Sequence, residues 1–341
     1  MTKRLEKVSW SFQNIWNESL EQRENWKLKP RNHIWASELG GAYIDRYYKM
    51  KGVVPSNPFD PRSLRKFEAG RIFEWIVEMV LKRAGILLSV QEWVEFQYPG
   101  LMRVTGKLDH LAGGKPNWDL VKEKLVANEL PPFILRTALA VIKHFSEKYP
   151  NGLDNIILEI RSVGSFMFHS YKTFRMPDPK HSLQLFHYLK AKDMPEGHLV
   201  YISKDDLCIA EIGVKNPSSF EKDYEADISL MTGYPKKESP PPAEKCIIFD
   251  KIAGRFAVNW KVGYSQYLTK VYGFKNQNAF DKKFKPTVAR WNRVLRRVVY
   301  GRMVTVDNKK ALKEMKDKFP NINGLIGIAK ERRRHAKTKQ G

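Results

Sequence analysis

The sequence is poor in cysteine and in long apolar runs. Only two of its 341 residues are cysteines, Cys208 and Cys246, too few for a four-cysteine zinc or iron–sulfur site. No run reaches the roughly 18 apolar residues that a membrane-spanning helix needs. The N-terminus, Met1–Arg4, leads into charged and aromatic residues rather than an apolar signal segment. We therefore expect a cytoplasmic protein without membrane spans.

Acidic residues are also scarce relative to basic ones. The chain has 60 Lys and Arg against 37 Asp and Glu, a net charge of +23. Such an excess favours a polyanionic partner, and DNA, single- or double-stranded, is the first candidate. A basic surface that serves solubility alone is the alternative. The sequence has neither a Gly-x-x-x-x-Gly-Lys-Ser/Thr phosphate loop nor a His-Glu-x-x-His zinc helix.

Two predicted strands carry carboxylates close to cations. Apolar residues alternate with polar ones around Gly106-Lys107-Leu108-Asp109 and around Glu159-Ile160-Arg161. The period of two in a strand places Lys107 and Asp109 on one face, and likewise Glu159 and Arg161. If these strands are neighbours, their carboxylates and cations converge. Such a cluster suits a hard divalent cation and a phosphate.

The order of predicted elements indicates an α/β core with a mixed central sheet flanked by helices. Strands over 88–98 and 101–111 form a hairpin, and a strand over 156–168 follows later. A helix over 181–192 precedes a second hairpin, 199–204 with 207–214.

A helix over 63–84 is predicted upstream, with Ser63 as N-cap and Gly85 as C-terminal cap. Glu74 and Glu78 share one face, where a metal or a neighbouring cation would offset their repulsion. An ordinary charged surface is the alternative. An apolar stripe predicts the buried face: Ile72, Phe73, Ile76, Val80 and Leu81.

Composition divides the chain into four parts. Residues 1–33 are a basic, Trp-rich N-terminal arm, and 34–238 are the α/β core. Three consecutive prolines introduce 239–329, a basic, aromatic and mainly helical region that suits single-strand binding or a solvated helix face. Residues 330–341 are a basic tail, expected to be disordered.

A helical insertion is predicted at about 112–155, between the two carboxylate strands. Helical spacing recurs in 118–126 and again in 132–148. This insertion is a candidate lid, DNA-contacting subdomain or protein-partner surface.

The motifs together resemble the RecB-like nucleases of the PD-(D/E)XK superfamily. A Gly-x-x-Asp strand ending at Asp109, a Glu-x-Lys-type strand at Glu159 and a helix with Gln184-x-x-x-Tyr188 follow in the family's order, after a helix with Gly-x-x-x-Glu74. The likeness covers about 34–212 and is greatest to phage-type exonucleases and to the nuclease of CRISPR adaptation. It implies a restriction-endonuclease-like core and DNA hydrolysis, as an exonuclease, with Mg²⁺ or Mn²⁺, in the host cytoplasm if the gene belongs to a phage. The iron–sulfur cluster of some relatives has no cysteines here.

The resemblance also assigns metal ligands. Asp109 and Glu159 are expected to hold the metal, with the carbonyl of Ile160 as a further ligand. Glu74 would complete the set directly or through water. These are oxygen donors, the type that Mg²⁺ and Mn²⁺ prefer.

One position departs from the family pattern. Arg161 stands where the family usually has Lys, and Arg stays charged, so it cannot act as a base, although it can stabilise phosphate charge. Lys107 or Lys172 is expected to position the nucleophile instead. Gln184 and Tyr188 are expected to reach a phosphate or to orient Arg161. The alternative is a weak or inactive homologue that binds nucleic acid or a protein partner.

Overall fold

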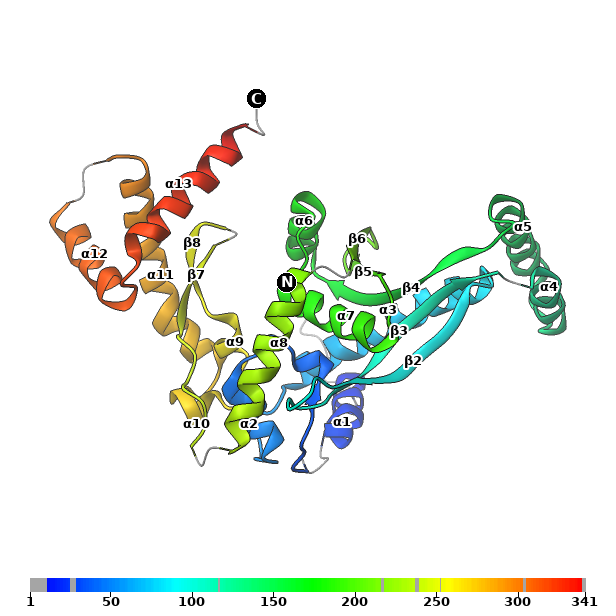
Figure 1. The fold of residues 1–341 in the computed structure, drawn as a ribbon, viewed down its shortest axis with the longest axis horizontal. Coiled ribbons are helices and arrows are strands. Elements are labelled where there is room, and N and C mark those ends of the chain that lie inside the picture. The colour runs from blue at the N-terminus through cyan, green and yellow to red at the C-terminus, as the bar shows by residue number, and fades with distance from the viewer. Residues whose placement is uncertain are drawn as a thin grey trace, which may run out of the picture. The chain divides into compact units, whose positions relative to one another are not determined.

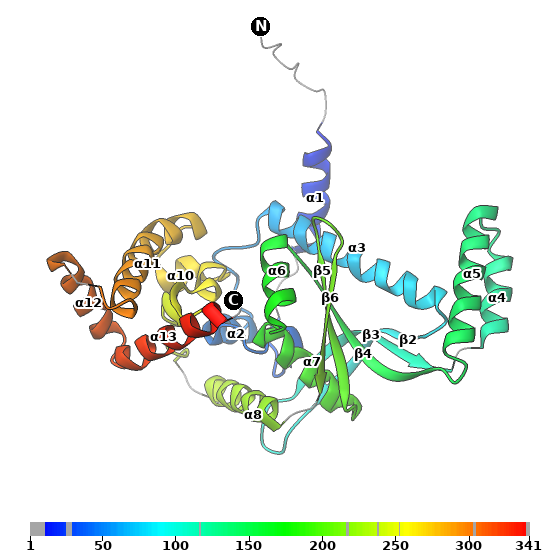
Figure 2. The same ribbon diagram turned by 90° about the horizontal axis from the view of Figure 1, so that it is seen from above.

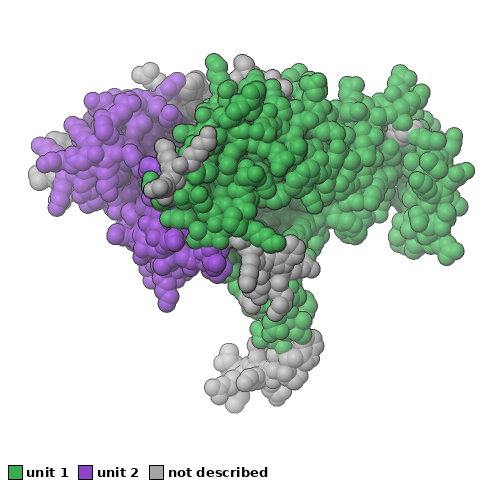
Figure 3. Space-filling model, turned by 60° about the horizontal axis from the view of Figure 1, so that its bottom comes forward, with its two compact units in different colours: residues 1–41, 46–53, 59–240 green, residues 42–45, 54–58, 241–341 purple. Residues whose placement is uncertain are grey.

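The computed structural model places the chain in two compact units. It describes residues 11–24, 29–115, 117–215, 218–236, 239–251, 253–302 and 305–338. The first unit comprises 1–41, 46–53 and 59–240, and the second comprises 42–45, 54–58 and 241–341 (Figure 3). The second unit thus includes two short segments that the sequence analysis places within 34–238.

The first unit is an α/β structure. Its strands are β1 (Ile34–Trp35), β2 (Leu87–Phe96), β3 (Val104–Gly114), β4 (Leu153–Val163), β5 (Glu196–Ser203) and β6 (Ile209–Lys215). Its helices are α1 (Phe12–Glu24), α2 (Tyr43–Met50, whose first turn belongs to the second unit), α3 (Pro61–Arg83), α4 (Trp118–Ala127), α5 (Pro132–Lys148), α6 (Ser165–Phe174), α7 (Pro179–Lys192) and α8 (Ser218–Gly233), with short 3₁₀ turns η1 (Ala36–Glu38) and η2 (Tyr234–Lys236).

The six strands form one mixed sheet in the order β1-β3-β4-β5-β6, with β2 paired to β3. The pairs β1–β3 and β4–β5 are parallel, and the remaining pairs are antiparallel. The predicted mixed sheet is therefore confirmed, as are the two hairpins, which are β2–β3 and β5–β6.

Strand β3 has one neighbour along one edge and two along the other. On the first edge, β2 pairs with β3 from Val104 to Ala112. On the opposite edge, β1 pairs with β3 at Val104 and Thr105, and β4 pairs with it only from His110 onwards. The stretch 106–109 therefore lies in a fork between β1 and β4. Its backbone on this edge has no strand partner, so side chains of other elements can bond to it.

Helices cover both faces of the sheet. Phe73, Val77 and Leu81 of α3 belong to a cluster with alternate residues of β4 and β5: Leu158, Ile160, Val200 and Ile202. On the other face, α7 packs close to β5, because Gly197 leaves room for Leu185 and Leu189; a Cβ at Gly197 would lie 3.0 and 3.1 Å from their methyl carbons. Side chains of β4 that alternate with the α3-facing set consequently point towards α7.

Helix α3 differs from its prediction in two respects. Its N-cap is Asp60, whose carboxylate accepts the backbone N–H of Ser63 at 2.7 Å, so Ser63 is the third residue of the helix rather than its cap. The expected buried stripe is also wrong in part: Ile72, Ile76 and Val80 are exposed, and only Phe73 and Leu81 face the sheet cluster. A long straight helix meets the twisted sheet along a narrow strip, which leaves much of the apolar stripe uncovered.

The strand predicted over 156–168 is shorter than expected. β4 ends at Val163, and α6 begins at Ser165. Asp205 accepts hydrogen bonds from the backbone and the hydroxyl of Ser165, and so stabilises the start of this helix. The residue pattern that predicted the strand therefore extends past the point at which helix α6 begins.

The predicted insertion is a hairpin of two helices. α4 and α5 lie side by side at the ends of β3 and β4 (Figures 1 and 2), and their bounds match the predicted ranges closely. Ala138 and Ile142 of α5 are buried. α5 also contacts α3.

The second unit is mainly helical, as expected, but it also contains a small β-hairpin that was not predicted. Its elements are β7 (Ile247–Asp250), β8 (Arg255–Val258), α9 (Trp260–Gly263), α10 (Leu268–Tyr272), α11 (Gln277–Val299), α12 (Val306–Lys318) and α13 (Ile322–Thr338). Phe256 of β8 packs edge-on against the fully buried Trp291 of α11, within a cluster that includes Met315 of α12 and Ala329 of α13.

The two ends of the chain are described in part. α1 gives the N-terminal arm a helix, while 1–10 and 25–28 lie outside the described residues. α13 continues through 330–338, so this part of the expected disordered tail is helical, and 339–341 lie outside the described residues. Within the described ranges, no helix is both long enough and apolar enough to cross a membrane.

Candidate functional site

Asp109 lies in the fork of the sheet and links β3 to β4 through its side chain. Its Oδ2 accepts the backbone N–H of Ile160 at 2.8 Å, and its Oδ1 accepts a longer bond of 3.4 Å from Gln91. The carboxylate thus takes the place of a strand-to-strand backbone bond. Because Asp109 is only 6% exposed, burial raises the pKa of its carboxyl above the usual value.

Glu159 is fully buried on β4, on the face that points towards α7. Its Oε1 is in ion-pair contact with Arg161. Neither of its carboxylate oxygens accepts a hydrogen bond from another described residue. Burial therefore raises the pKa of Glu159 well above its ordinary value, and the charge of Arg161 opposes this increase. Arg161 is thus the cation that this buried carboxylate already has, and a metal ion could take its place.

Arg161 is the cation at the centre of this cluster. Its Nη1 donates to the carbonyl of Ile160 at 2.9 Å and lies 3.8 Å from Asp109 Oδ2. Its Nη2 contacts Glu159 and donates to Gln184 Oε1 at 2.6 Å. Burial opposes the charge of Arg161, but the carboxylates of Glu159 and Asp109 raise its pKa above the ordinary value. One guanidinium thus faces all three groups expected to hold a metal on β3 and β4.

Helix α7 connects this cluster back to β3. Gln184 and Tyr188 share a helix face, and Gln184 Nε2 donates to the Tyr188 hydroxyl at 2.9 Å. That hydroxyl donates to the backbone carbonyl of Lys107 at 2.8 Å, within the fork. Gly106 is required beside it, because a Cβ there would lie 2.9 Å from Tyr188 Cε1 and 2.7 Å from the Cβ of Ala36. The Gly-x-x-Asp motif therefore lets Tyr188 approach the strand.

Glu74 approaches the cluster from α3. Burial, followed by the charge of Asp109, raises its pKa to about 7, while Arg161 and Arg71 act in the opposite direction. Glu78, the second carboxylate on this helix face, forms an ion pair with Lys82 at 2.5 Å instead. Three carboxylates thus influence one another at the site: Glu74, Asp109 and Glu159.

The two lysines expected to position the nucleophile, Lys107 and Lys172, do not lie where the sequence predicts. Lys107 contributes its backbone carbonyl to the fork, while its side chain is exposed. Lys172 lies exposed on α6, and no hydrogen bond or ion pair joins it to Asp109 or Glu159. Neither amine is held at the carboxylates.

Lys180 is a residue that sequence reasoning missed. It lies on α7 four positions before Gln184, which in turn lies four before Tyr188, so the three share one helix face. Burial, then the charge of Arg161, lowers the pKa of Lys180 to about 8. The same two causes lower the pKa of the adjacent His181, whose ring bonds to the hydroxyl of Tyr201 at 3.1 Å. In the sequence, the spacing Lys-x-x-x-Gln-x-x-x-Tyr was the pattern that could have pointed to Lys180.

The side chains present fit a hard divalent cation by their chemistry. Asp109, Glu159 and the Ile160 carbonyl offer oxygen donors, and apart from Arg161 the oxygens of Glu159 have no partner among the described residues. Within the same part of the chain, however, no three His, Cys, Asp or Glu side chains are already grouped around a single metal position. The Arg161 guanidinium bonds to the same donors, so a metal would require this side chain to move.

Comparison with known proteins gives only distant likenesses. No protein-family model matches the sequence, and no curated protein sequence matches it. Among solved structures, the protein SSO0001 is similar with 18% identity and a TM-score of 0.38, over 68% of this chain and 89% of that one. The exonuclease LHK-Exo in complex with dAMP has 10% identity and a TM-score of 0.36, over 61% and 90% of the two chains. A further structure of this alkaline exonuclease, from Laribacter hongkongensis, has 10% identity and a TM-score of 0.29, over 63% and 90%. Because these likenesses are so distant, residue roles have to be argued from the geometry of the chain itself.

Proposed function

We propose that this chain is a metal-dependent DNA nuclease of the PD-(D/E)XK type that hydrolyses phosphodiester bonds, as an exonuclease. The observation that carries the proposal is the convergence of Asp109, Glu159 and the Ile160 carbonyl on one cation, the guanidinium of Arg161. Three oxygen donors on two strands already surround one cation. They are therefore suited to bind a divalent metal, which is also positively charged. The sequence resemblance names the same three groups.

The chain's own residues would act mainly by position and charge. Asp109 and Glu159 would hold Mg²⁺ or Mn²⁺ together with the Ile160 carbonyl, and Glu74 would complete the set. When bound, such a metal lowers the pKa of a water molecule and stabilises developing charge on the phosphate. Arg161, displaced from Glu159 but tethered by Gln184, would contact the scissile phosphate and stabilise its charge. Tyr188 would keep the fork of β3 in place.

Lys180 is the best amine for the role that Lys plays elsewhere in the family. A pKa of about 8 leaves a useful fraction of the amine neutral near physiological pH, whereas an exposed lysine stays charged. Its helix face already contacts Arg161 through Gln184. We assign to Lys180 the orientation of the attacking water, or the acceptance of its proton.

A second candidate function is a non-catalytic member that binds nucleic acid or a protein partner. The observation that favours it is the ion pair of Arg161 with Glu159, which offsets the charge of this buried carboxylate without a metal. An Arg cannot act as a base, so a homologue without catalytic chemistry would keep such a pair at little cost.

A cleavage assay separates the two functions. The full-length protein is incubated with linear and circular DNA, in Mg²⁺, in Mn²⁺ and in EDTA. We expect metal-dependent cleavage of linear DNA, and loss of activity by orders of magnitude for Asp109→Asn and Glu159→Gln. Lys172→Gln is the matched control, because this exposed side chain makes no contact with the carboxylates. Cleavage at the wild-type rate by both carboxylate variants would remove the nuclease function from this site.

The substrate arms also test the mode of cleavage. Resistance of circular DNA would support an exonuclease, and nicking of circles would support an endonuclease at the same site. Absence of cleavage under every metal, combined with DNA binding in EDTA, would support the non-catalytic function.

A further inference from the structure

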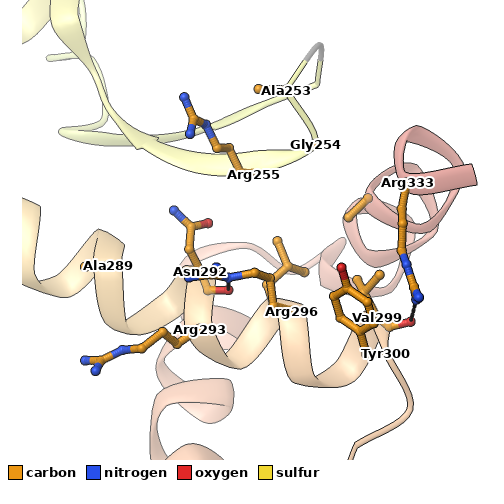
Figure 4. A pocket seen from close by; sticks show the side chains of 12 residues that line it. Ala253, Gly254, Arg255, Ala289, Asn292, Arg293, Arg296, Val299, Tyr300 and Arg333 are labelled. Carbon is orange, nitrogen blue, oxygen red and sulfur yellow. Dashed lines mark hydrogen bonds between the residues drawn. The ribbon is translucent and has the colours of Figure 1, made fainter. Parts of the chain in front are cut away.

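An open cavity of about 670 Å³ lies within the second unit, between the hairpin β7–β8, α11 and α13 (Figure 4). Its charged lining residues are all arginines: Arg255, Arg293, Arg296 and Arg333. No Asp or Glu is among the described residues that line it. Its volume is in the range of sites that bind small molecules in proteins.

Among the described residues that line the cavity, none is a counterion for its positive charge. Arg255 on β8 and Arg293 on α11 are exposed, and their side chains form no hydrogen bond or ion pair with another described residue. Arg296 and Arg333 donate to backbone carbonyls, those of Asn292 and Val299, each at 3.4 Å. Like charges that line one concave surface raise its positive potential and favour an anion with several acceptor oxygens.

An aromatic ring lies beside these cations. The Arg333 guanidinium is 3.6 Å from the centroid of the Tyr300 ring, and Figure 4 shows the two side by side at one end of the cavity. Tyr300 is about half exposed, at 47%. A ring with an arginine against it is a surface on which nucleic-acid bases stack, independently of base type. The cavity therefore combines phosphate-binding groups with a base-stacking group.

The walls of the cavity are fixed before any ligand arrives. The side-chain amide of Asn292 donates to the carbonyl of Phe256 at 2.8 Å and accepts its N–H at the same distance, which ties α11 to β8. Behind them, Phe256, Trp291 and Leu295 belong to the buried cluster of this unit. A rigid frame reduces the entropy that a ligand would otherwise lose on binding.

We propose that this cavity binds a phosphate-bearing nucleotide unit. Arg255, Arg293 and Arg296 contact the phosphate oxygens, while Tyr300, backed by Arg333, stacks on the base. The ligand is a free nucleotide or one unit of a single strand, which share this chemistry. The proposal goes beyond the nuclease function, because none of these residues belongs to the carboxylate site. It depends on binding alone and not on cleavage.

The test measures binding by the full-length protein in EDTA, where cleavage is absent. Fluorescence anisotropy with a labelled single-stranded oligonucleotide is repeated over a range of salt concentrations. We expect Arg293→Gln/Arg296→Gln to weaken binding at least about tenfold, and to reduce the slope of log affinity against log salt by about 0.7 for each phosphate that the variant no longer neutralises. The matched control is Lys282→Gln/Lys313→Gln, which removes equal charge from exposed positions on α11 and α12 outside the cavity.

A second pair of variants tests the stacking role. Tyr300→Phe keeps a ring and should bind like the wild type, while Tyr300→Ala should bind about tenfold more weakly. Circular dichroism and thermal unfolding establish that each variant is folded. Equal weakening by the arginine and lysine double variants, or binding by both at the wild-type level, would overturn the proposal.

Competition identifies the source of the nucleotide unit. Displacement of the oligonucleotide by a mononucleotide, sensitive to Tyr300→Ala, supports a free-nucleotide site. Displacement only by longer single strands supports a strand-binding site. Displacement by inorganic phosphate as efficient as that by nucleotide, with no effect of Tyr300→Ala, would overturn the nucleotide assignment. Every arm is measured in EDTA and scores binding alone, whereas the nuclease proposal is scored by metal-dependent cleavage, so failure here is distinguishable from failure of the nuclease proposal.

Discussion

The guanidinium of Arg161 donates a hydrogen bond of 2.6 Å to the side-chain oxygen of Gln184, and so joins strand β4 to helix α7. The same guanidinium contacts Glu159 and the carbonyl of Ile160. Gln184 is a neutral tether, so Arg161 can leave the carboxylate while it remains bound to the helix. In the proposed nuclease, Arg161 would therefore be the residue at which metal binding and phosphate binding meet.

The first prediction concerns competition between Arg161 and a metal. In EDTA, Arg161→Gln should unfold at a lower temperature than the wild type, because Glu159 and Asp109 lose the cation that offsets their burial. Added Mn²⁺ should raise its melting temperature more than that of the wild type, and calorimetry should show tighter Mn²⁺ binding. Arg103→Gln, at an exposed position before β3, is the control. Weaker Mn²⁺ binding by Arg161→Gln than by the wild type would contradict this competition.

Activity gives a separate result for the same position. Arg161→Lys should keep or raise cleavage, since lysine is the usual residue at this position in the nucleases that the sequence resembles, and Arg161→Ala should lower cleavage by orders of magnitude. If Arg161→Lys instead switches on a silent protein, the native chain is a non-catalytic homologue.

The second prediction concerns Lys180 and pH. Its folded pKa of about 8 is below the unfolded value, so between these two values the unfolded chain binds the extra proton, and stability rises with pH. The cost of charging the buried amine is therefore fully present below about pH 8 and disappears as pH rises towards the unfolded pKa. Lys180→Met should be more stable than the wild type at pH 7, and this advantage should shrink by pH 10. Urea unfolding at a series of pH values measures it.

Cleavage should respond to Lys180→Met in the opposite direction. We expect a large loss of activity, and loss of the rise in rate that we predict for the wild type as pH approaches 8. A variant that is more stable yet inactive separates a role in chemistry from a role in folding. Wild-type activity with an unchanged pH profile would exclude Lys180 from the reaction.

The third prediction concerns Gly106. An alanine Cβ would meet Ala36 at 2.7 Å and Tyr188 at 2.9 Å, so Tyr188 must move and lose its bond to the Lys107 carbonyl. We expect a loss of about 1–3 kcal/mol in the free energy of unfolding, the usual range for an overpacked core. Gly164→Ala is the control, because nothing lies within 4 Å of its added Cβ. Equal denaturation midpoints for the two variants in urea would show that the strand absorbs the methyl group.

The fourth prediction concerns the buried ion pair between Arg46 and Asp227. The guanidinium bonds to both carboxylate oxygens at 2.7 and 2.8 Å, and the two residues are 2% and 6% exposed. Arg46→Met leaves a buried carboxylate without this partner and should cost about 3–5 kcal/mol. The double variant Arg46→Met/Asp227→Leu should be less destabilised than Arg46→Met alone. Additive losses in a urea double-mutant cycle would argue against coupling between the pair.

Much of the fold could be predicted because it depends on local patterns. Alternation around Asp109 and Glu159 located the two strands, and helical spacing located α4, α5 and α7. The convergence of Asp109 and Glu159 was conditional on their strands being neighbours, and the pairing of β3 with β4 and the bond from Ile160 to Asp109 show that they are.

What the sequence did not show depends on burial and on partners far along the chain. The apolar residues Ile72 and Val80 look like a core stripe, yet α3 meets the sheet along a strip too narrow to cover them. Lys180 looks like any helix lysine until the structure shows that it is buried beside Arg161. Arg255 and Arg333 come from separate elements, so no local pattern predicts that they share a cavity.

The hairpin of α4 and α5 is connected to all three elements that carry the carboxylate cluster. It continues directly from β3 and β4, the strands of Asp109 and Glu159, and α5 also touches α3, the helix of Glu74. At the base of the hairpin, Gly114 pairs with Leu153, so the two strand ends that lead into it are one strand spacing apart, about 5 Å. A molecule that displaces this hairpin would therefore act on the ends of the two strands that carry Asp109 and Glu159, and on the helix that carries Glu74.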